Sequence, residues 1–368
     1  MKIEKMLVTG DALFIRRHQP LFEEISSQCQ HLNYLTGDQP FKIGFLNQMS
    51  KVFNKLIYIV SPSYANRLQK NSKVLIKKSK WIESKIREME DRPDFVLHIF
   101  GMYGPFWDVS DIPYGMYLDY TMRLAYKNWT PWAPFETPEK LSDWLNCERT
   151  LYERANHLFA MSRLVKSSLV DDYGISPEKI TVVGSFATRH TVYEGEKKFG
   201  SKQILFNAAQ FERKGGDLVL EAFKQVKQVV PTAKLVVIGK KLNNTFDGII
   251  NPGRIASMEE MRQLFLETDL VLAPGRCDPF PCFVIEAMNY GIPCIVSGND
   301  GMPEIVDHNI NGLVVDSLTP EAIAENILNL IEDIPTLMSM SLQARQKVKA
   351  ELNRHSVATK VMQAIGMD

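Results

Sequence analysis

Two carboxylates, Asp278 and Glu286, flank a run of residues that begins with proline, Pro279 to Ile285. A proline in the first turn of a helix is tolerated because its missing N–H would have no partner there, so this run predicts a helix start. Free N–H groups at such a start can face an anion, and here they belong to Cys282, Phe283 and Val284. The two carboxylates would then hold hydroxyl groups at opposite ends of an extended ligand. The alternatives are a helix cap for Asp278 and a buried, paired carboxylate for Glu286.

Two adjacent cations, Arg213 and Lys214, precede a pair of glycines just after the apolar run 203–207. The glycines permit close approach of the backbone to a ligand, and a helix is expected to begin near Asp217. Positioned cations and helix N-termini stabilise the charge that accumulates on a departing diphosphate. The pattern therefore indicates a diphosphate site, with a solvated basic turn as the alternative.

The elements that position these residues alternate between short apolar runs and amphipathic stretches, which predicts parallel sheets flanked by helices. In the second half, strands are expected at residues 203–207, 234–239, 270–274, 293–297 and 312–315, and helices at residues 217–230, 258–267, 283–289 and near Glu304. The first half repeats the pattern more weakly, with expected strands at residues 5–8, 56–60, 95–100, 114–118, 157–161 and 180–183. The predicted fold class is α/β, with two Rossmann-like, doubly wound parallel-sheet domains.

The chain has 368 residues, which suits two domains because single cores rarely grow beyond ~250 to 300 residues. The apolar pattern breaks between Phe186 and Ser201. We therefore expect an N-terminal domain over residues 1–186 and a C-terminal domain over residues 190–342. The last segment, residues 343–368, is expected to form one helix over residues 343–366 that fits either domain. Ligands of such tandem domains bind between the carboxyl edges of the sheets, so the two domains are expected to face each other across a cleft.

Composition argues against several classes of function. The 43 Lys and Arg residues balance the 43 Asp and Glu residues, so nucleic acid is not an expected partner. The 5 cysteines are scattered without CxxC spacing, which fits a reducing cytosol and indicates neither disulfides nor zinc. Asp108 and Asp111 are interpreted as parts of a turn rather than as metal ligands. With no long apolar run and no signal peptide, a cytoplasmic protein is expected.

The order of these motifs resembles the retaining family-4 glycosyltransferases of the two-domain GT-B fold. Their Glu-x7-Glu motif corresponds here to Asp278-x7-Glu286, and their Arg-Lys-Gly element to Arg213, Lys214 and Gly215. The resemblance continues through the segments 301–306 and 311–314 and covers residues 155 to 320.

The resemblance implies a role for each motif. Arg213 and Lys214 would bind the diphosphate of a nucleotide-sugar donor, and Glu286 would bind the ribose hydroxyls. Ile255 would lie beside the base. The transferred sugar would be oriented by Asp278 and by the backbone amides of Cys282, Phe283 and Val284. The family retains the anomeric configuration and needs no metal or cofactor besides the nucleotide sugar, most commonly a UDP-hexose such as UDP-glucose.

The chain departs from the family pattern at three places. The first acid is Asp278 rather than glutamate, one methylene shorter, which would affect the donor or the position of its sugar. The glycine-rich loop after the first strand is reduced to Thr9, Gly10 and Asp11. Where the family often has a histidine, this chain has Asp119, with His98 on the preceding strand. Either residue is a candidate for contact with the acceptor or the reacting sugar, and a structural role is the alternative for His98.

The segment 67–87 carries eight basic residues and one acidic residue, together with an apolar stripe and Trp81. One interpretation is a surface helix packed on its sheet. The other is a helix that docks on anionic lipid at the inner face of the membrane, where it would reach a glycan acceptor carried on lipid. Polysaccharide biosynthesis is the expected context. Nucleotide-sugar epimerases and sugar phosphorylases share the fold, and a non-catalytic partner of another transferase is a further alternative.

Overall fold

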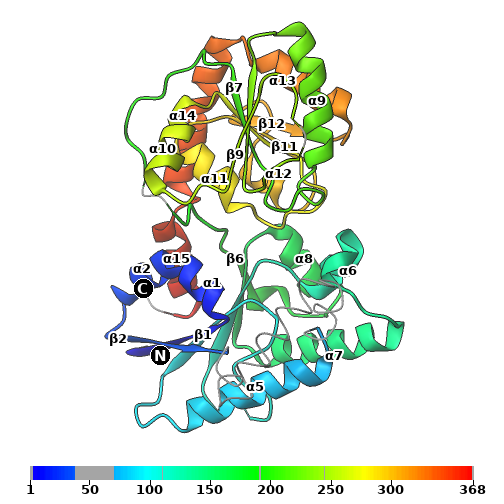
Figure 1. The fold of residues 1–368 in the computed structure, drawn as a ribbon. Helices are drawn as coiled ribbons and strands as arrows, with labels where there is room; N and C mark the ends of the chain where they lie inside the picture. The colour runs from blue at the N-terminus through cyan, green and yellow to red at the C-terminus, as the bar shows by residue number, and fades with distance from the viewer. Residues whose placement is uncertain (1–2, 38–69, 110, 190–191, 244, 367–368) are drawn as a thin grey trace, which may run out of the picture. The chain divides into compact units, whose positions relative to one another are not determined.

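The computed structural model describes residues 3–37, 70–109, 111–189, 192–243 and 245–366. The chain divides into two compact units, one of residues 1–184 and 357–368 and one of residues 185–356. Each unit contains a six-stranded sheet in which every neighbouring pair of strands is parallel (Figure 1). The α/β prediction is confirmed. The described residues do not include the expected strand at 56–60 or the start of the basic segment at 67–69.

The sheet of the first unit has the strand order β2-β1-β3-β4-β5-β6. Its strands are β1 (Lys5–Gly10), β2 (His31–Thr36), β3 (Phe95–Ile99), β4 (Tyr114–Leu118), β5 (His157–Ala160) and β6 (Ile180–Val182). The helices are α1 (Ala12–Arg17), α2 (Gln19–Ser26), α5 (Ser72–Arg87), α6 (Met122–Asn128), α7 (Pro138–Arg154), α8 (Arg163–Asp171) and α15 (Arg354–Ala364), with short 3-10 turns at Thr130–Trp132 and Pro177–Lys179.

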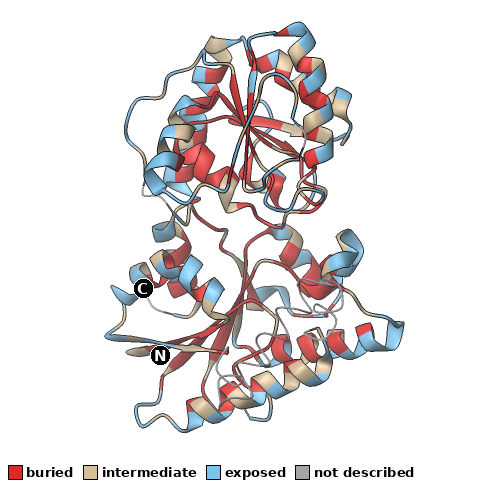
Figure 2. Cartoon of the chain, viewed as in Figure 1, coloured by how far each residue is buried: buried red, intermediate tan, exposed pale blue. Residues whose placement is uncertain are grey.

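Burial explains why most of these strands are readable in the sequence. Every residue of β3 and of β4 is buried, because helices cover both faces of a parallel sheet and both faces are then apolar. Figure 2 shows buried residues along the strands and exposed residues on the outer faces of the helices. Helix starts are fixed locally by hydroxyl caps, as where the side chain of Thr121 accepts from the N–H of Leu124.

The sheet of the second unit has the strand order β12-β11-β10-β7-β8-β9. Its strands are β7 (Gln203–Asn207), β8 (Lys234–Ile238), β9 (Ile249–Gly253), β10 (Leu270–Ala273), β11 (Cys294–Ser297) and β12 (Gly312–Val315). The helices are α9 (Gly216–Val229), α10 (Met258–Glu267), α11 (Cys282–Asn289), α12 (Met302–Ile305), α13 (Pro320–Leu330) and α14 (Ile334–Ala350). In Figure 1, α9 and α13 lie on one side of this sheet and α10, α11 and α14 on the other, as in a doubly wound domain.

Three features differ from the sequence prediction. The strand β2 was not expected, because its residues are exposed or half-buried and lack an apolar run. The strand β9 was not expected either, because it lies at a sheet edge and ends in Pro252 and Gly253. The single helix expected over residues 343–366 is wrong, since α14 ends at Ala350 and α15 begins at Arg354. Asn353 separates them: its amide nitrogen donates to the carbonyl of Lys349 at 2.8 Å, and its oxygen accepts from the N–H of Ser356 at 2.9 Å. No helix among the described residues is both long and apolar enough to cross a membrane.

Candidate functional site

The strand order of the second unit reverses between its neighbouring strands β7 and β10. In doubly wound sheets ligands bind at this point, outside the carboxyl ends of the strands. The structure has a pocket there, lined by side chains that include Asn207 at the end of β7 and Ala273 at the end of β10. Lys214 and Asp278, from the loops that follow the two strands, also line it. Its volume is about 10 Å³, the room of about one water molecule.

The two predicted cations and the first predicted carboxylate form one ion-paired cluster. Arg213 Nη1 lies 3.3 Å from one oxygen of Asp278, and Lys214 Nζ lies 3.2 Å from the other. The side chains are largely buried: Arg213 is 8% exposed, Lys214 17% and Asp278 14%. Burial by itself raises the pKa of Asp278, but the charges of Lys214 and Arg213 outweigh it and hold this pKa below its ordinary value. Asp278 is therefore ionised between two cations, and the cap of α11 is Pro281 instead.

The cluster depends on the close approach of two loops. Gly215 has a left-handed backbone with φ of 74°, and a Cβ added there would lie 2.3 Å from the carbonyl oxygen of Pro274. The N–H of Arg276 donates to the carbonyl of Arg213 at 2.8 Å and so joins the loops directly. The backbone N–H of Asp278 donates to the carboxylate of Asp300 at 2.7 Å. Because Asp300 follows β11, this bond ties the second loop to the segment after that strand. Glycine is thus required at position 215 by both its conformation and its neighbour.

Helix α11 begins four residues after Asp278, at Cys282. The N–H of Val284 donates to the carbonyl of Pro281 at 3.0 Å. The expectation that this amide is free to meet an anion is therefore wrong, because the helix makes its first hydrogen bond one residue earlier than a regular α-helical turn would. Phe283 and Val284 line the pocket, and the sulfur of Cys282 lies 3.7 Å from the hydroxyl of Ser185.

Glu286 lies in α11 with 6% of the residue exposed. Its carboxylate accepts a hydrogen bond from the hydroxyl of Thr188 at 3.2 Å. One turn later, Asn289 accepts from the backbone N–H of Tyr193 at 3.2 Å, so the segment before β7 is tied along this helix. Thr188 was not identified from sequence, where it appeared only in a polar segment at the expected domain boundary. Ile255 is half-buried in the loop between β9 and α10.

The two predicted residues of the first unit have different surroundings. His98 is fully buried on β3, where its Nδ1 lies 2.7 Å from the hydroxyl of Thr9 and its ring meets Tyr103 edge-on. Burial lowers the pKa of His98 to about 3, so the ring is neutral. Asp119 directly follows β4 and is half-buried.

A buried carboxylate that sequence analysis did not identify lies close to the start of α6. Glu148 in α7 accepts hydrogen bonds from the hydroxyl of Tyr173 and, at 3.3 Å, from the backbone N–H of Met122, three residues after Asp119. Burial raises the pKa of Glu148 to about 7 in spite of these donors. A signal exists in the sequence: the helical spacing of Trp144, Glu148 and Leu151 places the acid on the apolar stripe of α7.

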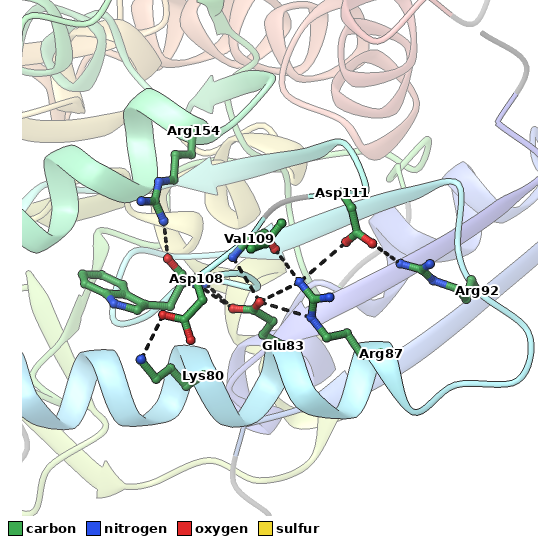
Figure 3. A network of polar contacts seen from close by, with 9 residues as sticks. Lys80, Glu83, Arg87, Arg92, Asp108, Val109, Asp111 and Arg154 are labelled. Carbon is green, nitrogen blue, oxygen red and sulfur yellow. Dashed lines mark hydrogen bonds and ion pairs between the residues drawn. The ribbon is translucent and has the colours of Figure 1, made fainter.

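The basic segment forms α5, and the one acidic residue of this helix, Glu83, ties it to the loop at residues 107–109. Glu83 is buried and accepts from the backbone N–H groups of Trp107 and Asp108 at 2.8 Å each, and from Arg87 at 2.9 Å (Figure 3). Lys80 pairs with Asp108 at 2.9 Å, so the loop balances part of the helix charge.

Asp108 and Asp111, the two residues interpreted as parts of a turn, are each paired with a basic side chain. Asp111 pairs with Arg92 at 2.6 Å. No group of three His, Cys, Asp or Glu residues in the described part of the chain has a geometry that could hold a metal ion.

Lys70, counted as part of the basic segment, is largely buried and donates to the carbonyl of Trp132. Burial lowers the pKa of Lys70 to about 8.

Residues 192–347 match a protein family described as glycosyl transferases group 1. The chain is 26% identical over 223 residues to the amylovoran biosynthesis glycosyltransferase AmsK of Erwinia amylovora. The match covers 56% of this chain and 54% of that protein. It is 27% identical over 240 residues to the putative colanic acid biosynthesis glycosyltransferase WcaL of Salmonella typhimurium, with 60% and 58% covered. The matches span little more than half the length of these curated relatives.

Two solved structures share the fold across the whole chain. Sucrose-phosphate synthase from Thermosynechococcus elongatus superposes with a TM-score of 0.68 at 14% identity and 98% coverage of both chains. Anabaena Alr3699/HepE, solved in complex with UDP and glucose, superposes with a TM-score of 0.62 at 14% identity, covering 98% of this chain and 99% of its own. The chain therefore has the GT-B fold.

Proposed function

We propose that this protein is a retaining glycosyltransferase that moves a hexose from a UDP-hexose, UDP-glucose first, to a glycan or lipid-linked glycan in polysaccharide biosynthesis. The observation that carries the proposal is the cluster of Arg213, Lys214 and Asp278 at the strand-order switch of the second unit. It lies within the residues that match the group 1 family. The polysaccharide context rests on the names of the amylovoran and colanic acid relatives.

The proposed roles follow from charge and burial. Arg213 and Lys214 bind the donor diphosphate and neutralise the charge that grows on it as the glycosidic bond breaks. Because both side chains are largely buried, their attraction for this charge is much stronger than it would be in water. A metal ion has no part in this proposal. Departure and attack occur on the same face of the sugar, which retains the anomeric configuration.

The remaining groups select and orient the donor. Glu286 accepts hydrogen bonds from the ribose hydroxyls, and Ile255 lies beside the base. The transferred sugar is oriented by Asp278 and by the first residues of α11, Cys282 and Phe283. Asp119, after β4, contacts the acceptor or the reacting sugar. His98 supports this edge from within the sheet through its hydrogen bond with Thr9.

The acceptor side of the proposal involves α5. Its exposed lysines, among them Lys73 and Lys77, are placed to meet anionic headgroups if the acceptor is carried on lipid. Peripheral association with the inner membrane face would follow.

A thermal-shift panel of nucleotide sugars tests the proposal. We expect UDP and UDP-glucose to raise the melting temperature of the protein, and Lys214→Ala to abolish the rise. Lys224→Ala, an exposed lysine of α9 paired with Glu221, is the matched control and should leave the rise unchanged. If no nucleoside diphosphate stabilises the protein, the proposal fails. Sugar epimerisation without transfer would indicate an epimerase, and binding without any turnover would indicate a non-catalytic partner.

A further inference from the structure

The carboxylate of Asp278 lies between the two cations that the proposed function gives to the donor diphosphate. Each of its oxygens contacts one cation, at 3.3 Å from Arg213 and 3.2 Å from Lys214. The same carboxylate and the same lysine line the small pocket at the strand-order switch. An anionic group of the protein itself thus occupies the position next to both cations.

The pocket beside this ion-paired cluster is small. At about 10 Å³ it holds about one water molecule. A carboxylate and a phosphate placed together between the same cations would also repel each other strongly, because the three side chains are largely shielded from water. A diphosphate that binds both cations must therefore separate Asp278 from at least one of them.

The surrounding contacts allow this separation without unfolding of the loop. The backbone N–H of Asp278 is held by Asp300 at 2.7 Å, and Arg213 is held by the side chain of Gln210 and the carbonyl of Cys277. These anchors hold the backbone of the loop and the side chain of Arg213, so the separation concerns the Asp278 side chain rather than the loop. The anchored backbone keeps the released carboxylate at the same edge of the pocket.

We propose that Asp278 is an internal anion that competes with the donor diphosphate for Arg213 and Lys214 and thereby sets the affinity for the donor. The identity of the ligand rests on the proposed function, but the competition itself concerns any diphosphate. Displacement of the carboxylate reduces the net binding free energy of the donor. The displaced carboxylate then becomes available to the hydroxyls of the transferred sugar. Asp278 then lowers ground-state binding and assists turnover.

Isothermal titration with inorganic pyrophosphate and with UDP tests the competition. We expect Asp278→Asn and Asp278→Ser each to bind pyrophosphate at least about fivefold more tightly than the unmodified protein. Asp217→Asn is the matched control, because Asp217 also lies beside this loop but pairs with Arg276, at 2.7 and 2.6 Å. It removes one negative charge from the same unit and should change pyrophosphate affinity by less than twofold.

The outcomes separate this inference from the proposed function. If either Asp278 variant remains folded and binds pyrophosphate no more tightly than the unmodified protein, Asp278 is not a competing anion and the inference is wrong. An equal gain in Asp217→Asn would also overturn it, since a general loss of negative charge would then explain the result. If the Asp278 variants gain affinity for pyrophosphate while UDP binds no better than pyrophosphate in every variant, the inference stands and the nucleotide-sugar donor is wrong.

Discussion

Asp278 and Glu286 are both acidic, but their surroundings give them different properties. Asp278 faces two cations, which hold its pKa below the ordinary value. Glu286 is buried in α11 and accepts a hydrogen bond from the neutral hydroxyl of Thr188. A carboxylate that accepts from a hydroxyl suits recognition of further hydroxyls, whereas a carboxylate between cations suits competition with an anion.

We expect Glu286→Ala to weaken UDP binding about ten- to hundredfold, because hydrogen bonds to a charged group contribute about 1.5 to 3 kcal/mol each. Pyrophosphate, which has no ribose, should bind the variant as well as the unmodified protein. Isothermal titration with both ligands measures the difference. Thr188→Val, which removes the hydroxyl partner but keeps the carboxylate, should bind UDP with little change. An equal loss of pyrophosphate affinity in Glu286→Ala would contradict the ribose role.

At the scale of the elements, the site is made where the loop between β7 and α9 meets the loop between β10 and α11. Neither loop carries the site alone: one supplies Arg213 and Lys214 and the other supplies Asp278. Their spacing depends on Gly215, whose missing side chain leaves room for the carbonyl of Pro274.

The substitution Gly215→Ala should therefore cost both stability and function. A left-handed backbone costs a non-glycine residue about 1 to 2 kcal/mol, and here the added methyl group also collides with Pro274. Gly174→Ala is the matched control, since Gly174 has a similar φ of 71° but a methyl group there would meet no described atom within 4 Å. Urea unfolding should show a larger loss for Gly215→Ala, and only this variant should lose UDP binding. Equal losses of stability would show that the two loops can separate freely.

The contact of α7 with the start of α6 gives the protein a pH-dependent stability. The ordinary pKa of a glutamate is 4.5, and burial raises that of Glu148 to about 7. Between these values the unfolded chain has released this proton and the folded protein has kept it, so stability falls as the pH rises through the window. The loss is complete above pH 7 and amounts to roughly 3 kcal/mol. The pKa of Lys70 nearby is lowered to about 8, so its titration follows at higher pH.

We expect Glu148→Gln to remove this dependence, because the amide does not titrate. Urea unfolding between pH 4.5 and 7 should give a flatter profile for the variant than for the unmodified protein, with the variant becoming relatively more stable as the pH rises. Glu153→Gln, an exposed acid in the same helix, should leave the profile unchanged. A constant difference between Glu148→Gln and the unmodified protein at every pH would contradict the prediction.

At the scale of the whole molecule, the charge is balanced but unevenly placed. The chain has no net charge, yet α5 concentrates lysines in the first unit. The structure reduces this excess, because Lys80 pairs with Asp108 and Lys78 lies 3.9 Å from Asp11. Lys73 and Lys77 are exposed on the same helix and are the residues best placed to meet a membrane.

We expect the double reversal Lys73→Glu with Lys77→Glu to reduce binding to phosphatidylglycerol vesicles about thirtyfold or more, since each lysine near an anionic surface contributes about 1 kcal/mol. Co-sedimentation with these vesicles, and with neutral phosphatidylcholine vesicles for comparison, measures the effect. The control is Lys198→Glu with Lys349→Glu, which makes the same change of charge at exposed positions outside α5. Equal losses in both pairs, or no binding by the unmodified protein, would leave α5 as an ordinary surface helix.

The fold class, most of the strands and the motifs of the second unit could be predicted from the amino-acid sequence alone. This is because a buried parallel strand must be apolar along its whole length, and a doubly wound domain repeats such strands at regular intervals. The lysine-rich helix α5 could be predicted from the helical spacing of its apolar residues, and the start of α11 from the prolines before it. Exposed or proline-containing edge strands such as β2 and β9 lack this pattern and were missed.

Which charged groups meet could not be predicted from the sequence, because it depends on how distant segments are brought together by the fold. Arg213 and Asp278 are 65 positions apart in the sequence, and their contact depends on two loops that lie together because β7 and β10 are neighbours in the sheet. Glu83 and Glu148 likewise face backbone N–H groups of distant segments. Local sequence patterns record burial and helix ends, whereas the partner of a buried charge is set by the order of strands in the sheet. That is why Asp278 was predicted from the sequence as a ligand-binding residue, and only the structure placed it between the cations.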